Sequence, residues 1–432
     1  MRNKPYLEMY DTQIQWLGEV PVSWDIRRLK YCLELVNEKL GSPPSGESYI
    51  GLENIESHTG HVFWPNENGT AEGTCNVFKP GDVLFGKLRP YLAKAAIMQT
   101  GGVCSTELLV FRPRKVDAKF LWYFLLSDGF IKTVDSSTYG AKMPRASWEF
   151  IGNLPMLMPH INEQKNIGRF LDTQTAQIDE LIALKEKQIE LLGIKRQAII
   201  SQAVTRGLNP DARMKPSGLD WLGEIPEHWQ LIRLKFLKRE PFMYGANEVS
   251  DIDDPDLPRY VRITDIKEDG SLRDDTFRSL PENIAEPYLL KEGDFLFARS
   301  GATVGKAFMY SIDWGKACFA GYLIRFRPNL SKLRSGFIKF FLQSVFYENQ
   351  VGESTIQATI QNVSAEKYSN FWMAVPPLAN QDEIIAYLED QTSQIDKVIN
   401  LSKVQIDALR EYRQLLITSA VTGKIDLRGV EI

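Results

Sequence analysis

The feature that most constrains the fold of this 432-residue chain is an internal duplication. The run WLGEVPVSWDIRRLK at residues 16–30 recurs as WLGEIPEHWQLIRLK at residues 221–235, with nine of fifteen positions identical at an offset of 205. GDVLF recurs as GDFLF at an offset of 212, and FRP recurs at an offset of 215. A repeat of this length predicts two copies of one structural unit.

The offset between the two copies grows along the chain and settles at 217 from residue 161 onward. Twelve residues of insertion therefore accumulate inside the globular halves, while the later part of each copy keeps one register. Length differences of this kind fall in surface loops, where binding specificity usually resides. We expect two modules that share a frame and differ in their loops.

A long helix closes each copy. Roughly 40 residues from Glu163 to Ala203 contain no proline, and Asn162 and Asn380 stand where an N-cap is expected. Apolar residues recur in steps of three and four, the pattern of a coiled-coil seam. The seam residues of the two copies are Ile178, Ile182, Ile189, Leu192, Ile199 and Ala203, and Ile395, Ile399, Ile406, Leu409, Leu416 and Ala420.

The seam is interrupted at Lys185 and Arg196, and at the equivalent Ser402 and Arg413. Because both copies carry the same seam and the same breaks, we expect the helices to pair with each other. Two similar halves usually pack about a two-fold axis, which makes the paired helices antiparallel. About 30 paired residues would span about 45 Å.

The globular halves are predicted to be mixed α/β structures of the α+β type. The GDxLF motifs open apolar runs typical of strands, and the runs that end at Pro113 and Pro328 are expected partner strands. KFLWYFLLS and FIKFFLQSVF have helical spacing. The predicted fold has two pseudo-two-fold-related globular domains separated by two long antiparallel coiled-coil helices. The expected bounds are 1–162 for the first globular domain, 163–207 for the first helical spacer, 208–379 for the second globular domain, 380–426 for the second spacer and 427–432 for a tail.

Motifs of catalytic and metal sites are missing from the sequence. SGATVGKA at residues 300–307 approaches a P-loop, but only three residues separate Gly301 from Gly305, and Ala307 replaces the hydroxyl residue that holds magnesium. The four cysteines form no CxxC pair, and neither a Gly-x-Ser-x-Gly elbow nor a His-Glu-x-x-His motif occurs. We therefore predict a non-catalytic chain without a metal or cofactor.

Two loops of each half carry basic and amide side chains among small residues. One loop follows the GDxLF strand, and the other precedes the closing strand of the half. Arg and Lys suit phosphates and guanine edges, and Gln and Asn suit adenine edges. The candidate DNA-binding residues are Lys87, Arg89, Tyr91, Lys94, Lys142, Arg145, Arg299, Thr303, Lys306, Gln357, Thr359 and Gln361.

The net charge of −4 is low for a general DNA binder. It is compatible with DNA only if the basic residues gather on one face and acidic residues lie elsewhere, for example against a partner protein. No stretch approaches the ~18 to 20 apolar residues of a membrane span, and the N-terminal run MRNKPYLEMYDTQ lacks the core of a signal peptide. We expect a cytoplasmic protein without a membrane partner.

The order of these motifs, occurring twice, resembles the specificity (S) subunit of type I restriction-modification enzymes. The resemblance is carried by WLGEIPEHW, GDxLF, the TIQN loop at residues 359–362, the PP-L-x-x-Q approach to the helix, QID, and AVTGKID at residues 420–426. It covers nearly the whole chain. The first half departs from the pattern, because STYGAKMPR stands where the second half has the TIQN loop.

The resemblance implies that each globular half is a target recognition domain that reads one part of a split, asymmetric sequence in double-stranded DNA. It also implies that the helices set the gap and dock two modification (methyltransferase) subunits, with restriction subunits joining the larger complex. The residues by themselves leave a cytosolic two-domain scaffold for proteins open as the alternative. A P-loop enzyme is a third, weaker interpretation.

Overall fold

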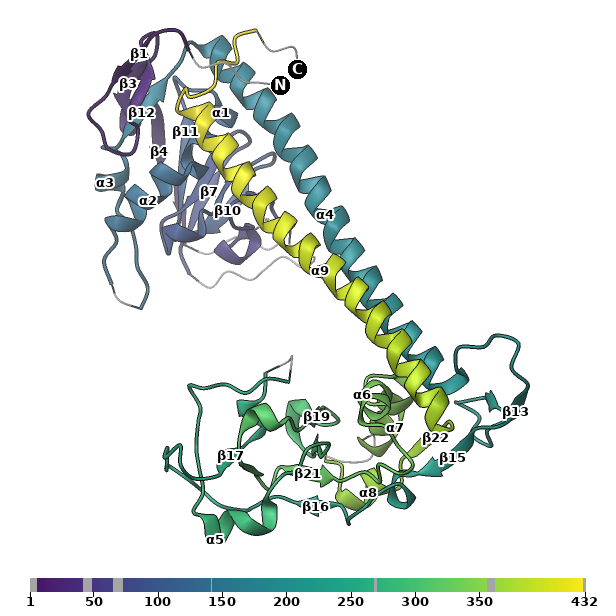
Figure 1. The fold of residues 1–432 in the computed structure, drawn as a ribbon. Helices are drawn as coiled ribbons and strands as arrows, with labels where there is room; N and C mark the ends of the chain where they lie inside the picture. The colour runs from purple at the N-terminus through teal and green to yellow at the C-terminus, as the bar shows by residue number, and fades with distance from the viewer. Residues whose placement is uncertain are drawn as a thin grey trace. The chain divides into compact units, whose positions relative to one another are not determined.

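The computed structural model describes residues 6–41, 49–64, 73–140, 142–267, 270–355 and 362–429. The chain divides into two compact units (Figure 1). The first unit consists of residues 1–186 and 403–432, and the second of residues 187–402. Each unit therefore contains one globular head, the start of one long helix and the end of the other.

The first unit combines short strands, three short helices and parts of the long helices α4 (Ile161–Arg206) and α9 (Leu378–Val421). Its strands are β1 (Met9–Asp11), β2 (Glu19–Pro21), β3 (Asp25–Arg28), β4 (Leu33–Val36), β5 (Lys39–Leu40), β6 (Tyr49–Ile50), β7 (Cys75–Phe78), β8 (Val83–Gly86), β9 (Ala95–Ile97), β10 (Gly102–Ser105), β11 (Leu108–Pro113) and β12 (Pro155–Met158). Its short helices are α1 (Ala118–Leu126), α2 (Asp128–Ser136) and α3 (Trp148–Ile151).

The second unit repeats this plan. Its strands are β13 (Met214–Pro216), β14 (Glu224–Pro226), β15 (Gln230–Arg233), β16 (Met243–Tyr244), β17 (Arg259–Val261), β18 (Phe295–Ala298), β19 (Ala307–Met309), β20 (Ala317–Phe319), β21 (Leu323–Phe326) and β22 (Trp372–Val375). Its short helices are α5 (Glu282–Ala285), α6 (Ser335–Phe341), α7 (Val345–Thr355) and α8 (Ala365–Ser369).

The central sheets of the two heads have the same topology. The strand order is β4-β11-β8-β9 in the first head and β16-β21-β18-β19 in the second, with antiparallel neighbours throughout. β8 and β18 are the strands of the GDxLF motifs. Their partner β11 contains the first FRP motif, and their partner β21 ends at Phe326, the first residue of the second FRP motif. Each strand and its partner were predicted from the sequence, and the structure confirms them. The predicted helices α1 and α6 are also confirmed.

Aromatic residues of the repeated tryptophan motif anchor each core. Trp24 and Trp229 are both 2% exposed. Trp24 packs edge-on against Phe120, and Trp229 packs the same way against Phe337. Burying side chains of this size contributes much of the apolar stabilisation of a small head. The tryptophans are therefore structural anchors.

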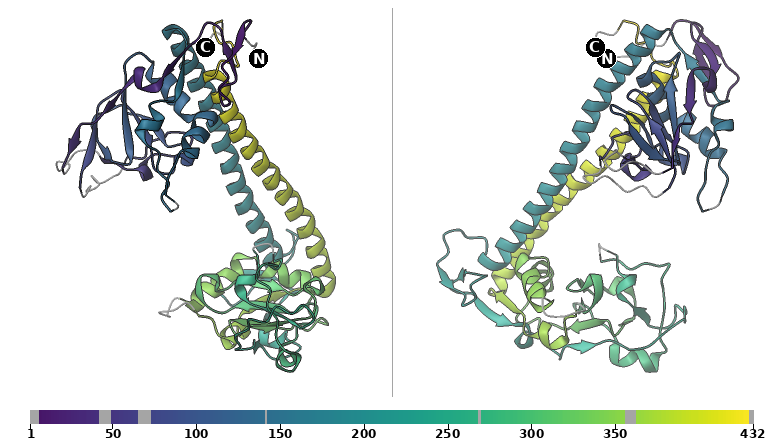
Figure 2. Two further views of the ribbon diagram at one scale, coloured as in Figure 1. Left: turned by 90° about the vertical axis from the view of Figure 1, so that its left-hand side faces the viewer. Right: turned by 180° about the vertical axis from the view of Figure 1, so that it is seen from behind.

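Within each unit, α4 and α9 run side by side in opposite directions (Figure 2). In the first unit, Asp179 accepts a hydrogen bond from Arg413 Nε at 2.9 Å, and the later residue Glu186 accepts one from the earlier Arg410 at 3.0 Å. In the second unit, Arg196 Nε donates to Asp396 at 3.1 Å. The antiparallel pairing predicted from the seam is confirmed.

The predicted breaks in the seam are part of the packed interface. Ser402 is 3% exposed and Arg413 is 6% exposed, so both positions are buried like their apolar neighbours. Arg196 and Arg413 are equivalent residues, and their partners Asp396 and Asp179 are equivalent too. The polar seam residues thus form the same ion pair twice.

The predicted helix caps were wrong. α4 begins at Ile161 and α9 at Leu378, so Asn162 and Asn380 lie inside the first turns. Instead, the buried Gln164 donates to Pro159 O at 2.8 Å and accepts from the backbone N–H of Asp117 at 2.8 Å. Its equivalent, Gln381, makes the corresponding bonds to Pro376 O and from Arg334 N. Each glutamine therefore ties a helix start to the head, and at α4 the preceding His160 accepts from the backbone N–H of Asn162 through Nδ1 at 3.4 Å.

Candidate nucleic-acid interface

The first candidate loop of each head connects two antiparallel strands. It links β8 to β9 in the first head and β18 to β19 in the second. Lys87 and Arg299 are equivalent first residues of these loops, and Lys94 and Lys306 are equivalent last residues. The SGATVGKA segment is therefore the loop of a β-hairpin. A P-loop leads from a strand into a helix, so this geometry argues against the P-loop interpretation.

In both heads, the second candidate loop is hydrogen-bonded to the first. Ala146 N donates to Lys87 O at 2.9 Å, and the equivalent Val363 N donates to Arg299 O at 2.8 Å. The two loops lie far apart in the sequence, and the same backbone hydrogen bond joins them twice. Each head thus has one composite loop surface.

In the first head, Arg89, Tyr91 and Lys142 are exposed, while Lys87 is half-buried. Arg89 adopts a left-handed backbone conformation with φ 51° at the start of the 3-10 helix η3 (Pro90–Leu92). Left-handed non-glycine residues are uncommon and often mark functional loops. These three exposed side chains are free to meet a ligand.

Two other candidates of the first head have intramolecular partners. Lys94 Nζ donates to Leu52 O at 2.6 Å. Arg145 forms a two-pronged ion pair with Glu107 at 3.0 Å, and this hydrogen bonding raises the pKa of Arg145. Both cations therefore stabilise the loop surface, and their contact with DNA stays a prediction.

In the second head, Arg299 is partly covered and stacks over the Tyr244 ring, with its guanidinium carbon 4.9 Å from the ring centroid. Its Nε is buried and has no hydrogen-bond partner among the residues that the structure describes. Thr303 is half-buried and Lys306 is exposed. Gln357, Thr359 and Gln361 lie outside the described residues.

Two buried tyrosines bind the backbone of the glycine-rich loop in the second head. Tyr347 Oη donates to Gly305 O at 2.8 Å, and Gly305 N donates to Tyr368 Oη at 3.1 Å. Gly305 has φ +85°, and a Cβ there would lie 2.6 Å from Val351 Cγ1. Only glycine satisfies both conditions. The loop is thereby fixed with Lys306 at the surface.

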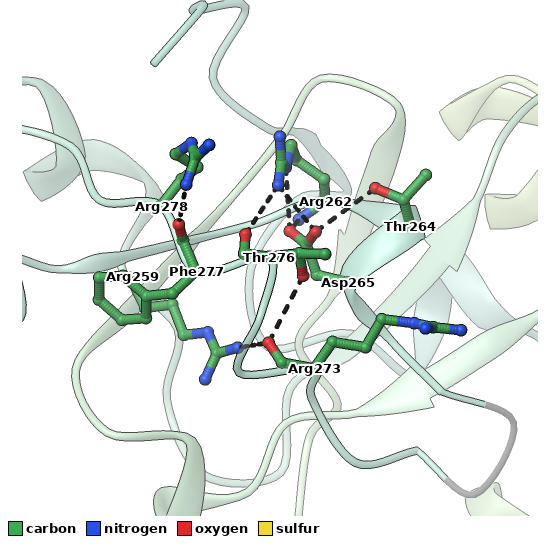
Figure 3. Close-up of polar contacts among 8 residues, drawn as sticks. All are labelled: Arg259, Arg262, Thr264, Asp265, Arg273, Thr276, Phe277 and Arg278. Atoms are coloured by element: carbon green, nitrogen blue, oxygen red, sulfur yellow. Dashed lines mark hydrogen bonds and ion pairs between the residues drawn. The ribbon is translucent and has the colours of Figure 1, made fainter. Parts of the chain in front are cut away.

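A groove of about 620 Å³ adjoins this loop within the second unit. Thr303 and Lys306 line it together with Lys267, which belongs to a separate segment at residues 259–278. That segment holds five basic residues, namely Arg259, Arg262, Lys267, Arg273 and Arg278, and an equal number of acidic residues, namely Asp265, Glu268, Asp269, Asp274 and Asp275. Because the two signs balance over these 20 residues, the sequence gives no signal of a basic surface there. Arg262, for example, binds the buried carboxylate of Asp265 through two nitrogens, at 3.0 and 2.9 Å (Figure 3).

One feature missed from the sequence is the attachment of each head to the returning helix, which we call the latch. In the first unit, Arg413 donates to His58 O at 3.0 Å, Gln414 donates to Leu126 O at 2.7 Å, and Thr418 Oγ1 accepts from Asp128 N at 3.1 Å. The side chains of one helix thus bind three backbone atoms of the head.

The second unit has the equivalent latch. Arg196 donates to Gln343 Oε1 at 3.0 Å, Gln197 donates to Glu348 Oε2 at 2.8 Å, and Ser201 Oγ accepts from Val345 N at 3.0 Å. The recurrence of Arg-Gln-x-x-Ile-Ser/Thr at an offset of 217 was the available signal. These residues position the heads on the helices and lie outside the candidate loops.

Among the described residues, no group of three or more His, Cys, Asp or Glu side chains is arranged to hold a metal ion. In the same part of the chain, no helix is long and apolar enough to cross a membrane.

The chain is similar to specificity subunits of type I restriction enzymes. It is 24% identical over 347 residues to the type I restriction enzyme MjaVIII specificity subunit of Methanocaldococcus jannaschii, which covers 76% of each chain. It is 22% identical to a putative type I restriction enzyme MjaX specificity subunit of the same organism, over 95% of this chain and 96% of the relative.

Solved structures share the fold. A chain from a study of complex assembly and conformational transition in the type I R-M system superimposes with a TM-score of 0.74 at 19% identity, covering 93% of this chain and 98% of that chain. The HsdS subunit from Thermoanaerobacter tengcongensis superimposes with a TM-score of 0.54 at 20% identity, covering 94% and 98%. The model of the type I restriction modification DNA specificity domain matches residues 66–191 and 253–407, one match in each copy of the repeat. With the duplicated heads, the paired helices and this double match, the chain belongs to the type I restriction modification DNA specificity domain family.

Proposed function

We propose that this chain is the DNA sequence-recognition subunit of a type I restriction-modification complex. Each head reads one half of an asymmetric bipartite target in double-stranded DNA, and the helices set the spacing between the halves. The observation that carries the proposal is the composite loop surface, which is built by the same backbone bond in both heads but carries different side chains. A shared frame with different loops suits two half-sites of different sequence.

The chain itself is proposed to be non-catalytic and cytoplasmic. Methylation and cleavage belong to partner subunits that carry their own cofactors. We propose that residues 1–162 and 208–379 are the two target recognition domains. Residues 163–207 and 380–426 are the helical spacers.

Exposed apolar residues on the long helices support the docking of two modification subunits. Leu181 and Leu184 of the first unit are 42% and 61% exposed. Their equivalents in the second unit, Val398 and Leu401, are 40% and 58% exposed. Exposed apolar residues that gather on one helix face are typical of protein interfaces. One equivalent pair in each unit suits two copies of the same partner, and restriction subunits would join that assembly.

The test exchanges residues 217–375 for the same region of a relative with a different target. The exchanged chain is expressed with the modification subunits, and methylated sites are mapped across the genome. We expect one half of the methylated sequence to change and the other half to stay. A change in both halves, or methylation by the purified chain alone, would contradict the proposal.

The alternative, a scaffold that binds proteins, makes a different prediction. If Lys87→Ala combined with Arg89→Ala left both the sequence preference and the phosphate affinity of the complex unchanged, the scaffold would be favoured. As a control, Lys115→Ala removes an exposed cation of the same head that lies outside both candidate loops, and it should leave DNA binding unchanged. Under our proposal, the paired change weakens DNA binding, because backbone phosphates supply much of the affinity.

A further inference from the structure

A pocket of about 260 Å³ lies in the second unit where α4 ends and α9 begins, and we call it the linker pocket. It borders residues 207–213, which connect α4 to β13 (Figure 1). Its walls come from this connection, from the repeated tryptophan motif and from the first two turns of α9. All of these residues belong to one unit, so the pocket is a feature of that unit alone.

The first unit fills the equivalent position with an aromatic ring. Tyr6 is 5% exposed and packs edge-on against Trp24, with the ring centroids 5.7 Å apart. Its hydroxyl donates to Glu163 Oε1 at 2.6 Å, and the guanidinium carbon of Arg428 lies 4.7 Å from its ring centroid. The tyrosine ring is therefore bound by an indole, a carboxylate and a guanidinium.

Two of these partners have equivalents around the linker pocket. Trp24 corresponds to Trp229 at the offset of 205, and Glu163 corresponds to Asn380 at the offset of 217. Trp229 and Asn380 both line the pocket. The position that Tyr6 takes in the first unit is therefore the linker pocket of the second unit.

A carboxylate and a cation also border the linker pocket. Asn380 donates to Glu383 Oε2 at 3.2 Å, and both residues line the pocket, so a carboxylate stands beside the equivalent of Glu163. Arg206, the last residue of α4, lines the pocket too and has an exposed side chain. The pocket thus offers the three kinds of group that Tyr6 contacts in the first unit.

The tyrosine ring itself has no equivalent in the second unit. Tyr6 corresponds to Asp211, and Leu427, which is 1% exposed in the same core cluster as Tyr6, corresponds to Pro210. Residues 208–211 are all exposed, so neither Asp211 nor Pro210 takes the buried position. In the first unit, two separate segments meet here through Tyr6 and Arg428. One connection replaces both segments in the second unit, and the pocket results.

The size and the lining of the pocket suit one aromatic ring. A cavity of about 150 Å³ is already large enough to bind benzene. An indole favours an edge-on or offset partner ring, and a guanidinium is attracted to a ring face. A buried hydroxyl needs a hydrogen-bond partner, which the Glu383 carboxylate supplies. Together these groups select a phenol ring over a plain hydrocarbon ring.

We propose that the linker pocket binds a single phenol ring, with the ring against Trp229 and the hydroxyl donating to Glu383. The ring belongs either to a free phenolic compound or to a tyrosine side chain of a peptide, and the experiments below distinguish these sources. The lining residues belong to neither candidate loop, so the proposal does not depend on the proposed function.

The first test titrates p-cresol, which is the tyrosine side chain without its backbone, into the full-length chain by calorimetry. We expect a dissociation constant on the order of 1 mM, because so small a ligand gains little free energy. Toluene lacks the hydroxyl and should bind about tenfold more weakly. Glu383→Gln should narrow that difference. Equal binding of p-cresol and toluene by the parent chain would contradict the proposed hydroxyl contact.

Ala212→Phe tests the location of the site. Ala212 is half-buried and lines the pocket, so the added ring blocks it and should abolish p-cresol binding. Val249→Phe adds the same ring at a position of the second unit that is 95% exposed, and it should leave binding unchanged. Absence of p-cresol binding by the parent chain at about 10 mM, or full binding by the Ala212→Phe chain, would overturn the proposal.

Tyr6→Ala tests the equivalence of the two positions. It opens the same position in the first unit, so the number of p-cresol molecules bound at saturation should rise from one to two. Equilibrium dialysis with labelled p-cresol counts them. The ligand should also recover part of the thermal stability that the variant loses, because it binds the folded chain. A folded variant that still binds one molecule would refute the equivalence.

A peptide with the sequence KPYLE, taken from residues 4–8, identifies the source of the ring. Competition with p-cresol measures its affinity, and KPALE is the control without the ring. Tighter binding than p-cresol assigns the site to a tyrosine of a protein segment. Binding no tighter than p-cresol assigns it to a free phenolic compound. Equal competition by KPALE would show that no ring is recognised and would contradict the proposal.

Discussion

A buried ion pair links the two repeated motifs of each head at the level of single residues. Arg112 of the first FRP motif binds Asp82 of GDVLF through two bonds of 2.9 and 2.8 Å. Arg327 of the second FRP motif binds Asp294 of GDFLF in the same way, at 2.7 and 2.6 Å. Asp294 is fully buried and Arg327 is 7% exposed, and hydrogen bonding to Asp294 raises the pKa of Arg327.

Arg327→Met tests the importance of this pair. It leaves the Asp294 carboxylate buried without its counter-charge, and breaking such a pair costs about 3–5 kcal/mol of unfolding free energy. Adding Asp294→Asn to the same chain is expected to restore part of the loss, because the uncompensated charge is then gone. Chemical denaturation measures both variants, and a double variant less stable than the single one would refute this account.

The two motifs could be identified from the sequence, but their partnership could not. The GDxLF and FRP patterns predict a strand and its neighbour, and the pairings of β8 with β11 and of β18 with β21 confirm this. The ion pair depends on the register that sets Phe111 opposite Val83, and on the side of the sheet that each charged group faces. Similarly, Lys94 and Arg145 could be proposed as DNA contacts, but Leu52 O and Glu107 come from segments that only the fold brings near.

At the scale of elements, the latch supplies a helix cap from outside the helix. The preceding residue Ser127 makes no side-chain capping bond to α2. Instead, Thr418 of α9 accepts the hydrogen bond from the first N–H of α2, at Asp128. Satisfying an unpaired N–H at a helix start stabilises the helix and also ties it to the element that supplies the acceptor.

Thr418→Val keeps the side-chain shape and removes the acceptor. We expect a loss of about 1 kcal/mol in unfolding free energy, the usual value of a cap. Ser201→Ala should cost a similar amount in the second unit, and the two losses should add because the residues share no partner. Denaturant midpoints of the single and double variants measure this.

Thr173→Val is the matched control on the same kind of helix. The Thr173 hydroxyl is exposed and donates only to Arg169 O of its own helix. Its loss should change stability by no more than about 0.5 kcal/mol. An equal loss at residues 173 and 418 would show that the latch hydroxyl has no special role.

In the long helices, the hydrophobic periodicity predicts the buried seam residues but does not predict the helix ends. Seam residues such as Ile178 and Leu416 are buried as predicted, because the heptad pattern needs no knowledge of tertiary structure. The caps predicted at Asn162 and Asn380 are wrong because α4 and α9 begin before these asparagines, and residue type alone does not locate the first residue of a helix. Gln164 and Gln381 tie the helix starts to the heads through contacts that the local sequence does not encode, and they supply no acceptor to the first N–H groups of the helices.

At the scale of the whole molecule, the repeat predicts two equal docking sites for the modification subunit. Leu184→Asp places a charge on the exposed apolar face of the first unit, and Leu401→Asp does so in the second. Each single variant is expected to assemble with one modification subunit and the double variant with none, because desolvating a carboxylate opposes docking. Native mass spectrometry counts the bound subunits.

Val249→Asp is the control for that count, since Val249 is 95% exposed and belongs to the second head. It should leave both modification subunits bound. Two subunits retained by the double Leu184/Leu401 variant would place the docking surface elsewhere on the chain.

The latch of the first unit also determines when the first head can fold during synthesis. The core of the N-terminal head contains Leu17 and Trp24 together with Leu416, Ile417 and Val421 of the last helix. A ribosome must therefore translate the final residues of α9 before the earlier-made head can be completed. The later-made second unit, residues 187–402, is available in full before that point. A premature stop codon within the final helix would thus spare most of the second unit and leave the first head open, with its apolar surface exposed to chaperones and proteases.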